Sequence, residues 1–257
     1  MPLYITSLNS GSNGNCYYVG NAQEAVLVDA GLSCRQIEVR MKRLGLSLQT
    51  VKAIFVSHEH SDHISGIDQL AYKYQLPVYI TTPTLRTARF AKRGFPIRSF
   101  HADEPARVGD LWVTAFPKHH DAADPHSFLV SGQGTNVGVF TDIGVACEQV
   151  VHHFRQCHAA FLETNYDEDL LENGRYPYFL KQRIRGGKGH LSNQQALELL
   201  KMHKSPLMSH VLLSHLSQQN NSPQVVRDLF APHVDSTQLI VTSRLAETPV
   251  YAVGNAV

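Results

Sequence analysis

The pattern of apolar and polar positions along the chain predicts short strands that alternate with amphipathic helices. Apolar runs of about four to eight residues between turn residues are typical of buried strands. Apolar residues spaced three and four apart are typical of a helix that covers a sheet with one face. The expected strands are residues 4–8, 16–19, 25–28, 53–56, 78–81, 111–116, 128–130, 136–140, 159–162, 211–213, 238–242 and 249–253. The expected helices are residues 33–44, 64–74, 82–93, 147–154, 192–203 and 222–230.

The expected strands fall into two groups, and helices follow each group. The sequence contains no linker, low-complexity tract or tandem repeat that would divide it. With 257 residues, 43% of them hydrophobic, the chain can bury one large core. We therefore predict a single domain over residues 1–257 of the α/β class. Its architecture is expected to be an αββα four-layer sandwich, in which two sheets pack face to face between outer layers of helices.

A dense run of potential metal ligands follows the apolar segment 53–56. The stretch VKAIFVSHEHSDHISG places His58, His60, Asp62 and His63 in an H-x-H-x-D-H run. Imidazole and carboxylate ligands suit Zn, Mn or Fe. On an extended segment His58 and His60 project to the same side and can share one ion. Asp62 and His63 fall where the chain turns into the next helix, so they suit a second ion. The alternative is a polar loop with solvated histidines.

Further ligand-type residues stand where other strands are expected to end, and side chains from several strand ends commonly build one site. These residues are Asp29, His120, Asp142, Glu163 and His215. We predict that the first ion is held by His58, His60 and His120, although the neighbouring His119 competes for the last position. We predict that Asp62, His63 and His215 hold the second ion and that Asp142 bridges the two. Asp29 is expected to support the metal loop by accepting hydrogen bonds, with an ordinary turn residue as the alternative.

Composition and charge narrow the class of protein. The net charge of +1 excludes a globally basic nucleic-acid binder, and the 15 histidines agree with a metal protein. No apolar run reaches the roughly 18 residues that a membrane helix requires. The N-terminal stretch MPLYITSLNS lacks the features of a signal peptide. The four cysteines form no C-x-x-C and are expected to be reduced packing residues. We expect a cytoplasmic protein that makes no contact with a membrane.

One stretch carries a local excess of positive charge. In YPYFLKQRIRGGKG, residues 176–189, we expect Lys181, Arg183 and Lys188 to bind substrate phosphates. Arg183 is the best candidate for a bidentate contact. A charged helix face in solvent is the alternative explanation of this stretch.

Taken together, these motifs resemble the metallo-β-lactamase superfamily over nearly the whole chain. The resemblance rests on Asp29, the H-x-H-x-D-H run, His120, Asp142 and His215 in the family's order. Longer stretches are similar to the YycJ/WalJ nuclease group, which is related to ribonuclease Z. These are SLNSGSNGNCYYV, FPKHHDAADP, and YPYFLKQRIRGGKGHLSN followed by LSHLSQQNN.

The resemblance implies a fold of the metallo-β-lactamase type and a metal-dependent hydrolase with two divalent ions, Zn, Mn or Fe. It implies a DNA exonuclease, with degradation from the 5′ end favoured. A hydroxide that bridges the ions would attack phosphorus in line, and Asp62 would help to orient it. His190, held by Glu163, would donate a proton to the leaving oxygen. Asp62, His190 and Glu163 are therefore the expected catalytic residues.

Other functions remain open at this point. A phosphodiesterase for small or cyclic nucleotides would use the same metals in a closed cleft. A thioester hydrolase of the glyoxalase II kind would not need the pair formed by Glu163 and His190. A metal-dependent nucleic-acid binder or sensor would be expected to have lost ligands, which this chain retains. The sequence leaves the oligomeric state open, a dimer included.

Overall fold

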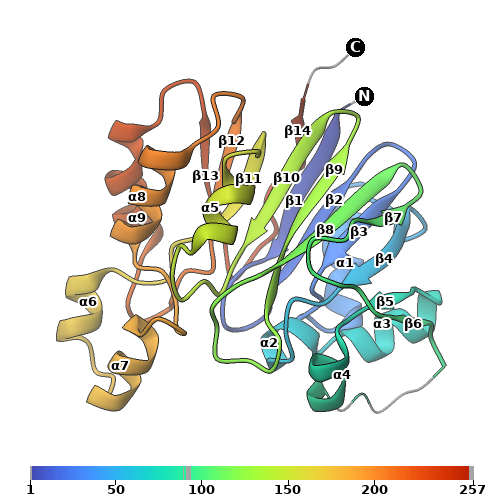
Figure 1. The fold of residues 1–257 in the computed structure, drawn as a ribbon, viewed down its shortest axis with the longest axis horizontal. Coiled ribbons are helices and arrows are strands. Elements are labelled where there is room, and N and C mark those ends of the chain that lie inside the picture. Colours follow the sequence, from blue (N-terminus) through green and yellow to red (C-terminus); the bar gives the residue numbers. More distant parts are fainter. Residues whose placement is uncertain (1, 89, 91–93, 255–257) are drawn as a thin grey trace.

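Within residues 2–88, 90 and 94–254, which the computed structural model describes, two seven-stranded sheets lie face to face (Figure 1). The first sheet has the strand order β14-β1-β2-β3-β4-β5-β6. Its strands are β1 (Leu3–Asn9), β2 (Cys16–Gly20), β3 (Ala25–Val28), β4 (Val51–Phe55), β5 (Val78–Tyr79), β6 (Ile97–Arg98) and β14 (Tyr251–Val253). The strands β2 and β3 form an antiparallel hairpin, and β3, β4, β5 and β6 are parallel neighbours.

The second sheet has the strand order β13-β12-β11-β10-β9-β8-β7. Its strands are β7 (Ala106–Val108), β8 (Leu111–Pro117), β9 (His126–Gly132), β10 (Thr135–Phe140), β11 (Ala159–Glu163), β12 (His210–Ser214) and β13 (Gln238–Val241). The strands β10 to β13 are parallel, and both β8 and β10 pair antiparallel with β9. Because β8 and β10 therefore run in the same direction, the carboxyl ends of β8, β10, β11 and β12 reach one edge of the sheet.

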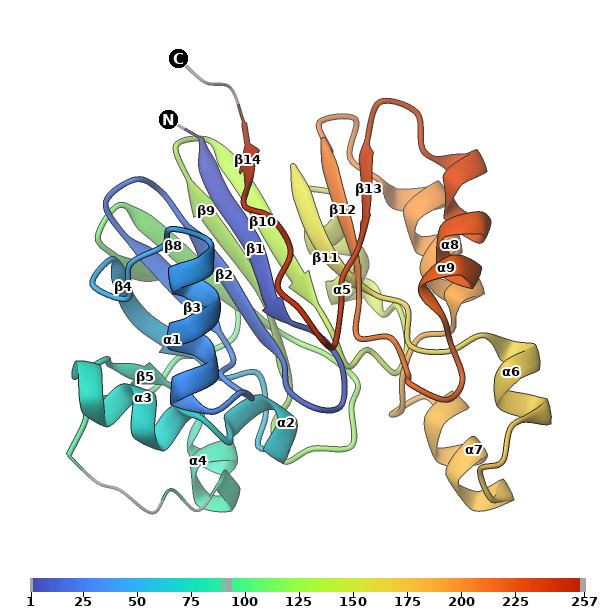
Figure 2. The ribbon, with the colours of Figure 1, turned by 180° about the vertical axis from the view of Figure 1, so that it is seen from behind.

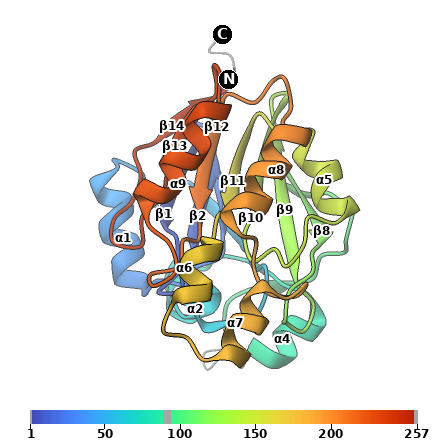
Figure 3. The same cartoon turned by 90° about the vertical axis from the view of Figure 1, so that its left-hand side faces the viewer.

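The described residues also form helices, most of which cover the outer faces of the two sheets. They are α1 (Cys34–Arg43), α2 (Ser61–Ile64), α3 (Ile67–Tyr74), α4 (Thr82–Ala88), α5 (Glu148–Phe154), α6 (Glu168–Asn173), α7 (Tyr178–Arg185), α8 (Asn193–His203), α9 (Pro223–Phe230) and the 3₁₀ helix η1 (Ala231–His233). Seen from behind, α1 and α3 lie outside the first sheet (Figure 2). The helices α5, α8 and α9 lie outside the second sheet, whereas α6 and α7 lie beyond its edge (Figure 3).

The buried side chains form three apolar clusters, one for each contact between layers. Phe55 of the first sheet and Phe128 of the second meet between the sheets, with ring centroids 5.6 Å apart. Ile37 of α1 packs in the cluster between the helices and the first sheet, and Phe154 of α5 packs in the cluster against the second. Burial of apolar surface is the main stabilising contribution in each cluster. The αββα four-layer sandwich predicted from the sequence is confirmed.

Three of the residues that follow strand ends adopt positive φ angles. Asp29 after β3 has φ 60°, Asp142 after β10 has φ 57°, and His215 after β12 has φ 58°. This left-handed region costs a non-glycine residue about 1–3 kcal/mol, so it persists only where the surroundings fix the backbone. The carboxyl ends of β3, β10 and β12 lie at the end of the sandwich that carries α2 and α7, opposite the two chain termini (Figure 1).

The helix expected over residues 64–74 is interrupted, because α2 ends at Ile64 and α3 begins at Ile67. The N–H of Gly66 donates to the carbonyl of Ala30. A β-carbon on Gly66 would come within 1.8 Å of the carbonyl oxygen of Leu32. The close approach of the two loops therefore requires glycine there and turns the chain out of a single continuous helix.

Other differences concern short or exposed elements. The strand expected over residues 78–81 covers only Val78–Tyr79, and β6, β7, α6 and α7 were not predicted as elements. The helix expected over residues 82–93 is described to Ala88, and residues 89 and 91–93 lie outside the described residues. The helix expected over residues 192–203 begins with a capping box, in which Ser192 and Gln195 are partners. In the part of the chain that the structure covers, no helix has the length and apolar character needed to cross a bilayer.

Candidate metal centre

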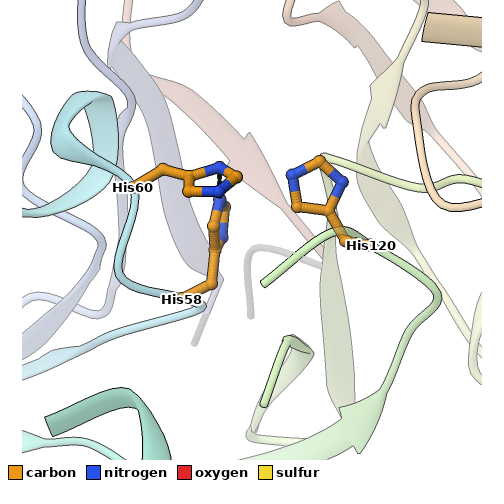
Figure 4. A group of neighbouring side chains, drawn as sticks. All are labelled: His58, His60 and His120. Carbon is orange, nitrogen blue, oxygen red and sulfur yellow. Dashed lines mark hydrogen bonds between the residues drawn. The ribbon is translucent and has the colours of Figure 1, made fainter. Parts of the chain in front are cut away.

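Three histidines from two loops form the first group of potential metal ligands. His58 and His60 lie on the loop between β4 and α2, and Nε2 of His58 is 3.1 Å from Nδ1 of His60. His120 joins them from the loop after β8, with its ring centroid 4.9 Å from that of His58 (Figure 4). The three residues place ligand atoms within 4.8 Å of one another. His119, the alternative to His120, belongs to none of these groups and is exposed.

A second group lies beside the first and joins the two sheets. Nε2 of His63 lies 3.5 Å from Oδ2 of Asp62, and Nε2 of His215 lies 3.9 Å from the same oxygen. Asp62 and His63 belong to α2, whereas His215 follows β12. These three side chains also place ligand atoms within 4.8 Å of one another. Residues more than 150 positions apart in the sequence thus converge on one point.

Asp142 lies between the two groups. Its Oδ2 is 3.1 Å from Nε2 of His63, and its Oδ1 is 3.2 Å from Nδ1 of His215 and 3.8 Å from Nε2 of His120. The side chain is 3% exposed. A carboxylate that lies within reach of both groups has the position that a bridging ligand of two cations needs.

Hydrogen bonds fix which nitrogen of the histidines faces the centre. The hydroxyl of Ser57 donates to Oδ2 of Asp29 at 2.8 Å, so Ser57 accepts the Nδ1–H of His58 at 2.8 Å. His63 donates its Nδ1–H to Asp29 at 2.7 Å. The Nε2 atoms of His58 and His63 therefore point inward. This is the arrangement in which an outer hydrogen bond orients a ligand and selects its tautomer.

The same principle holds for the histidines of the second sheet. His120 donates its Nδ1–H to the carbonyl of Gly189 at 3.0 Å. His215 donates its Nδ1–H to Oε1 of Glu163 at 3.1 Å. Asp29 also binds the backbone of the loop that carries His58 and His60, because its Oδ1 accepts the N–H of Ser57 at 2.8 Å. Asp29 thus holds both the backbone of the metal loop and one of its ligands.

The charges of these buried groups depend on one another. Burial and the nearby His63 and Lys118 hold the pKa of His58 well below its usual range, so its ring is neutral. Burial also lowers the pKa of His120, to about 4. Burial opposes a charged His63, but Asp142, Asp29 and Asp62 raise its pKa well above the usual value. Neutral imidazole and ionised carboxylate are the forms that bind metal ions.

Two buried atoms at the centre have no hydrogen-bond partner among the described residues. They are Nε2 of His120 and Oδ2 of Asp142. Leaving a buried polar atom unpaired costs about 1–3 kcal/mol, and more for a charged group. A divalent cation satisfies both an imidazole nitrogen and a carboxylate oxygen. The donor set therefore fits divalent metal binding.

Glu163 and His190 form a pair beside the metal ligands. Oε1 of Glu163 accepts the Nδ1–H of His190 at 2.8 Å, and its Oε2 accepts the backbone N–H of Ile143 at 2.6 Å. Burial opposes ionisation of Glu163, but His190 and His215 outweigh it and lower the pKa to about 2. The His190 side chain is 21% exposed, whereas that of Glu163 is fully buried. Glu163 thus holds the Nδ1–H side of the His190 ring, and His190 lines the adjoining pocket.

A pocket of about 230 Å³ opens over the centre. His60, Asp62, His120, Asp142, His190 and His215 line its floor, and Tyr176, Leu180, Arg183 and Ile184 line one wall. Of the three basic residues predicted to bind substrate, only Arg183 reaches this pocket in the described chain. Lys181 instead donates to the carbonyl of Glu172, and Lys188 is exposed on the loop after α7.

Three polar residues of the site, Ser57, Lys118 and Asn15, were not predicted from the sequence. Ser57 directly precedes the ligand run, and Lys118 lies two positions before His120. Lys118 is 5% exposed and donates to the carbonyl of Thr141 at 2.7 Å. Asn15 of the glycine-rich turn donates to Asp62 at 3.2 Å. Their positions next to recognised motifs were the only available signal.

Residues 24–216 match the family model described as the beta-lactamase superfamily domain. The chain is 34% identical over 230 residues to exodeoxyribonuclease YycJ of Bacillus anthracis, covering 88% of this chain and 87% of that protein. It is 31% identical over 219 residues to exodeoxyribonuclease WalJ of Streptococcus pneumoniae, covering 83% and 81%.

Solved structures share the fold at lower identity. The metallo-β-lactamase fold protein YhfI from Bacillus subtilis superimposes with a TM-score of 0.75 at 18% identity, covering 98% of this chain and all of that one. The short form of human tRNase Z superimposes with a TM-score of 0.64 at 14% identity, covering 95% and 98%. At these identities the likeness concerns the fold alone.

Proposed function

The chain belongs to the metallo-β-lactamase superfamily and, within it, to the group of the YycJ and WalJ exodeoxyribonucleases, and on that premise we propose that it is a two-metal exonuclease that hydrolyses DNA. One observation carries the proposal. Two groups of candidate metal ligands lie on either side of Asp142, directly beside the pair formed by Glu163 and His190. Phosphodiester hydrolysis needs this combination of charge neutralisation and a proton donor.

The proposed ligand set uses the two groups as they stand. His58, His60 and His120 would hold one ion, and Asp62, His63 and His215 the other, with Asp142 between them. The absence of cysteine ligands and the mixture of imidazole and carboxylate fit Zn, Mn or Fe. When bound, the two cations would activate water and neutralise charge on the phosphate. Asp62 lines the pocket and would orient the attacking water by a hydrogen bond.

His190 would donate the proton that the leaving oxygen needs. Its Nδ1–H is held by Glu163, so the ring can turn only a little and presents Nε2 to the pocket. An alkoxide leaving group is strongly basic, and general acid catalysis typically contributes about 10²–10⁴-fold in rate. Glu163 is a positioning residue here, because it touches His190 and His215 but does not line the pocket.

Arg183 would hold a phosphate of the substrate at the pocket wall. Its Nε lies 2.6 Å from Oδ2 of Asp121, and the arginine side chain is 58% exposed. Exposed ion pairs contribute only about 0–1 kcal/mol, so a phosphate can compete with Asp121 for the guanidinium. Lys181 and Lys188 remain predicted phosphate contacts for a longer strand that extends past α7.

The small pocket volume favours a second candidate, a phosphodiesterase for small or cyclic nucleotides. At about 230 Å³ the pocket lies below the range of about 300–1,000 Å³ that is typical of ligand sites. An exonuclease also needs to enclose only one terminal nucleotide, while the rest of the strand lies outside. The size of the polymer that is cleaved therefore separates the two candidates.

The deciding experiment compares 5′-labelled duplex DNA, single-stranded DNA and RNA as substrates in the presence of Mn²⁺ or Zn²⁺. Asp62→Ala is the control, because it removes a proposed ligand and the proposed water-orienting group. Release of labelled mononucleotide by the wild type but not by Asp62→Ala supports an exonuclease that starts at the 5′ end. Hydrolysis of bis-p-nitrophenyl phosphate with no cleavage of any polymer would instead identify a small-molecule phosphodiesterase.

A further inference from the structure

The helix α7 forms one wall of the metal pocket. Leu180, Arg183 and Ile184 line the pocket, and their spacing of three and four residues places them on one face of the helix. The whole of α7 is described, and none of its residues is buried. The helix lies at the end of the molecule, beyond the edge of the second sheet (Figure 3).

Two large aromatic side chains of α7 point into solvent. Tyr178 is 75% exposed and Phe179 is 73% exposed. Single exposed apolar residues are common on protein surfaces, but a large exposed ring on a helix that lines a pocket offers apolar surface that a partner can cover. Neither ring contributes to any of the three apolar clusters.

The two rings face different directions, because successive residues of a helix are rotated by about 100°. Phe179 lies one turn before Arg183, only about 40° away around the helix axis, so it extends the rim of the pocket. Tyr178 lies about 160° from Leu180 and therefore points away from the pocket. Phe179 is thus the aromatic residue next to the proposed phosphate contact.

The charge near Phe179 indicates which kind of partner could cover the ring. Residues 176–190 contain Lys181, Arg183, Arg185 and Lys188 and no acidic residue. Arg183 and Arg185 form exposed ion pairs with Asp121 and Glu172, which a phosphate can replace. A second copy of this chain would bring the same positive charge against this surface, because a two-fold interface pairs like patches. A nucleic-acid strand instead offers negative phosphates for the basic residues and a flat base for the ring, which is the usual composition of single-strand binding sites.

We propose that Phe179 is a stacking platform for a nucleobase of the strand just outside the metal pocket, while Arg183 holds the adjoining phosphate. This inference rests on the proposed nuclease function and adds the place where the uncleaved strand leaves the site. The scissile phosphate must reach the candidate ligands that line the pocket, so the rest of the strand must pass its rim. Stacking on phenylalanine is tolerant of base identity, which suits an enzyme that degrades any sequence.

The test measures binding of fluorescent single-stranded oligothymidylate to the metal-loaded full chain in a His190→Ala background, which slows cleavage. Phe179→Ala and Phe179→Leu are each expected to weaken binding about 5- to 100-fold, as the loss of one stacked base does. Phe179→Trp is expected to retain the affinity. Tyr178→Ala, an equally exposed neighbour on the far side of α7, is the matched control and should change the affinity less than about two-fold.

A second oligonucleotide that lacks bases next to its terminal nucleotide isolates the stacking contact. It should bind the parent and the Phe179→Ala protein equally. Equal binding of the complete oligonucleotide to both proteins, while the wild type cleaves DNA, would refute the stacking site and leave the nuclease function intact. No DNA cleavage by the wild type would remove the nuclease function itself, and the stacking site with it. A sedimenting dimer that both Tyr178→Ala and Phe179→Ala dissociate would identify the surface as an interface between copies and overturn the inference.

Discussion

Oε1 of Glu163 accepts the Nδ1–H of His190 at 2.8 Å. The same oxygen accepts the Nδ1–H of His215 at 3.1 Å. One fully buried carboxylate thus orients both the proposed proton donor and a proposed metal ligand. The backbone N–H groups of Ile143 and Leu191 bind its other oxygen and fix the carboxylate in place. The proposed proton donor and the candidate metal centre therefore belong to one hydrogen-bonded network.

Replacement of His190 by alanine is expected to slow DNA hydrolysis by about 10²-fold or more, which is the lower range of general acid catalysis. The effect should depend on the leaving group. A p-nitrophenyl ester of thymidine 5′-phosphate releases a weakly basic phenolate that needs no proton, so its hydrolysis should fall far less. The measurement compares the rates for the two substrates under single-turnover conditions.

Glu163→Gln is the companion variant, since glutamine retains the shape and can still accept the N–H of Ile143. It should show the same dependence on the leaving group with a smaller loss, because His190 is present but less firmly oriented. If both substrates slow down equally in His190→Ala, the residue serves the metal centre or folding and does not act as the proton donor.

Ser57→Ala is expected to weaken binding of the first metal ion by about 10- to 100-fold, as the loss of an outer hydrogen bond to a metal ligand does. The hydroxyl of Ser57 is the acceptor that holds Nδ1 of His58, and it links this ring to Asp29. Competition with a chromophoric chelator measures the affinity. Ser57→Thr retains a hydroxyl and should bind metal nearly as the wild type does. Equal metal affinity of all three proteins would show that Ser57 does not contribute to metal binding.

The fold could be predicted from the sequence because the buried elements carry strong patterns. The strands β3, β4 and β11 are short apolar runs bounded by polar residues, and the helix α8 begins with a capping box. The two-sheet architecture follows from the number and order of such elements. The interruption between α2 and α3 could not be predicted, because it depends on the carbonyl of Leu32, a distant residue that approaches Gly66.

The candidate ligands could be recognised because histidine and aspartate gather in the loops and the short helix that follow strand ends. The sequence pattern could not reveal the supporting contacts. The bond from His120 to the carbonyl of Gly189 involves a main-chain atom that carries no sequence signal. The basic stretch was recognised by composition, but its geometry was not. Only the folded chain separates Arg183, at the pocket wall, from Lys181, which is turned toward α6.

We predict that the metal-loaded protein contains two divalent ions per chain and that His120→Ala retains fewer. His119→Ala is the matched control, because this neighbouring histidine is exposed and should leave the content unchanged. Elemental analysis measures the content. Loading should also raise the free energy of unfolding, by about 2.7 kcal/mol at a free metal concentration 100 times the dissociation constant. Equal metal content in His119→Ala and His120→Ala would contradict the assignment.

Arg183→Ala is expected to weaken the binding of single-stranded DNA at every sequence and to reduce the slope of log affinity against log salt by about one. The reason is the loss of one phosphate contact and of the counterion that this contact releases. Lys201→Ala provides the comparison, because this lysine of α8 is exposed and does not line the pocket. An unchanged slope in Arg183→Ala would show that this side chain serves only its ion pair with Asp121.

His153 gives a prediction for stability that is separate from the metal centre. Its ring stacks on Phe116 with centroids 4.1 Å apart, it is 6% exposed, and neither ring nitrogen has a hydrogen-bond partner among the described residues. Burial, assisted by His152, lowers its pKa below the ordinary value of 6.5, although Asp103 opposes the shift. In the folded protein His153 therefore stays neutral at a pH at which the unfolded chain binds a proton.

The sign of the pH effect follows from this difference. As pH falls below about 6.5 the unfolded state takes up more protons, so the free energy of unfolding decreases, by at most about 1.4 kcal/mol per pH unit for one group. The decrease stops below the folded pKa of His153. In His153→Phe, which keeps an aromatic ring against Phe116, this contribution is absent. Urea unfolding at pH 7, 6 and 5 should show the variant gaining stability relative to the wild type as pH falls. A constant difference between the two proteins at all three pH values would mean that His153 is protonated equally in the folded and unfolded states.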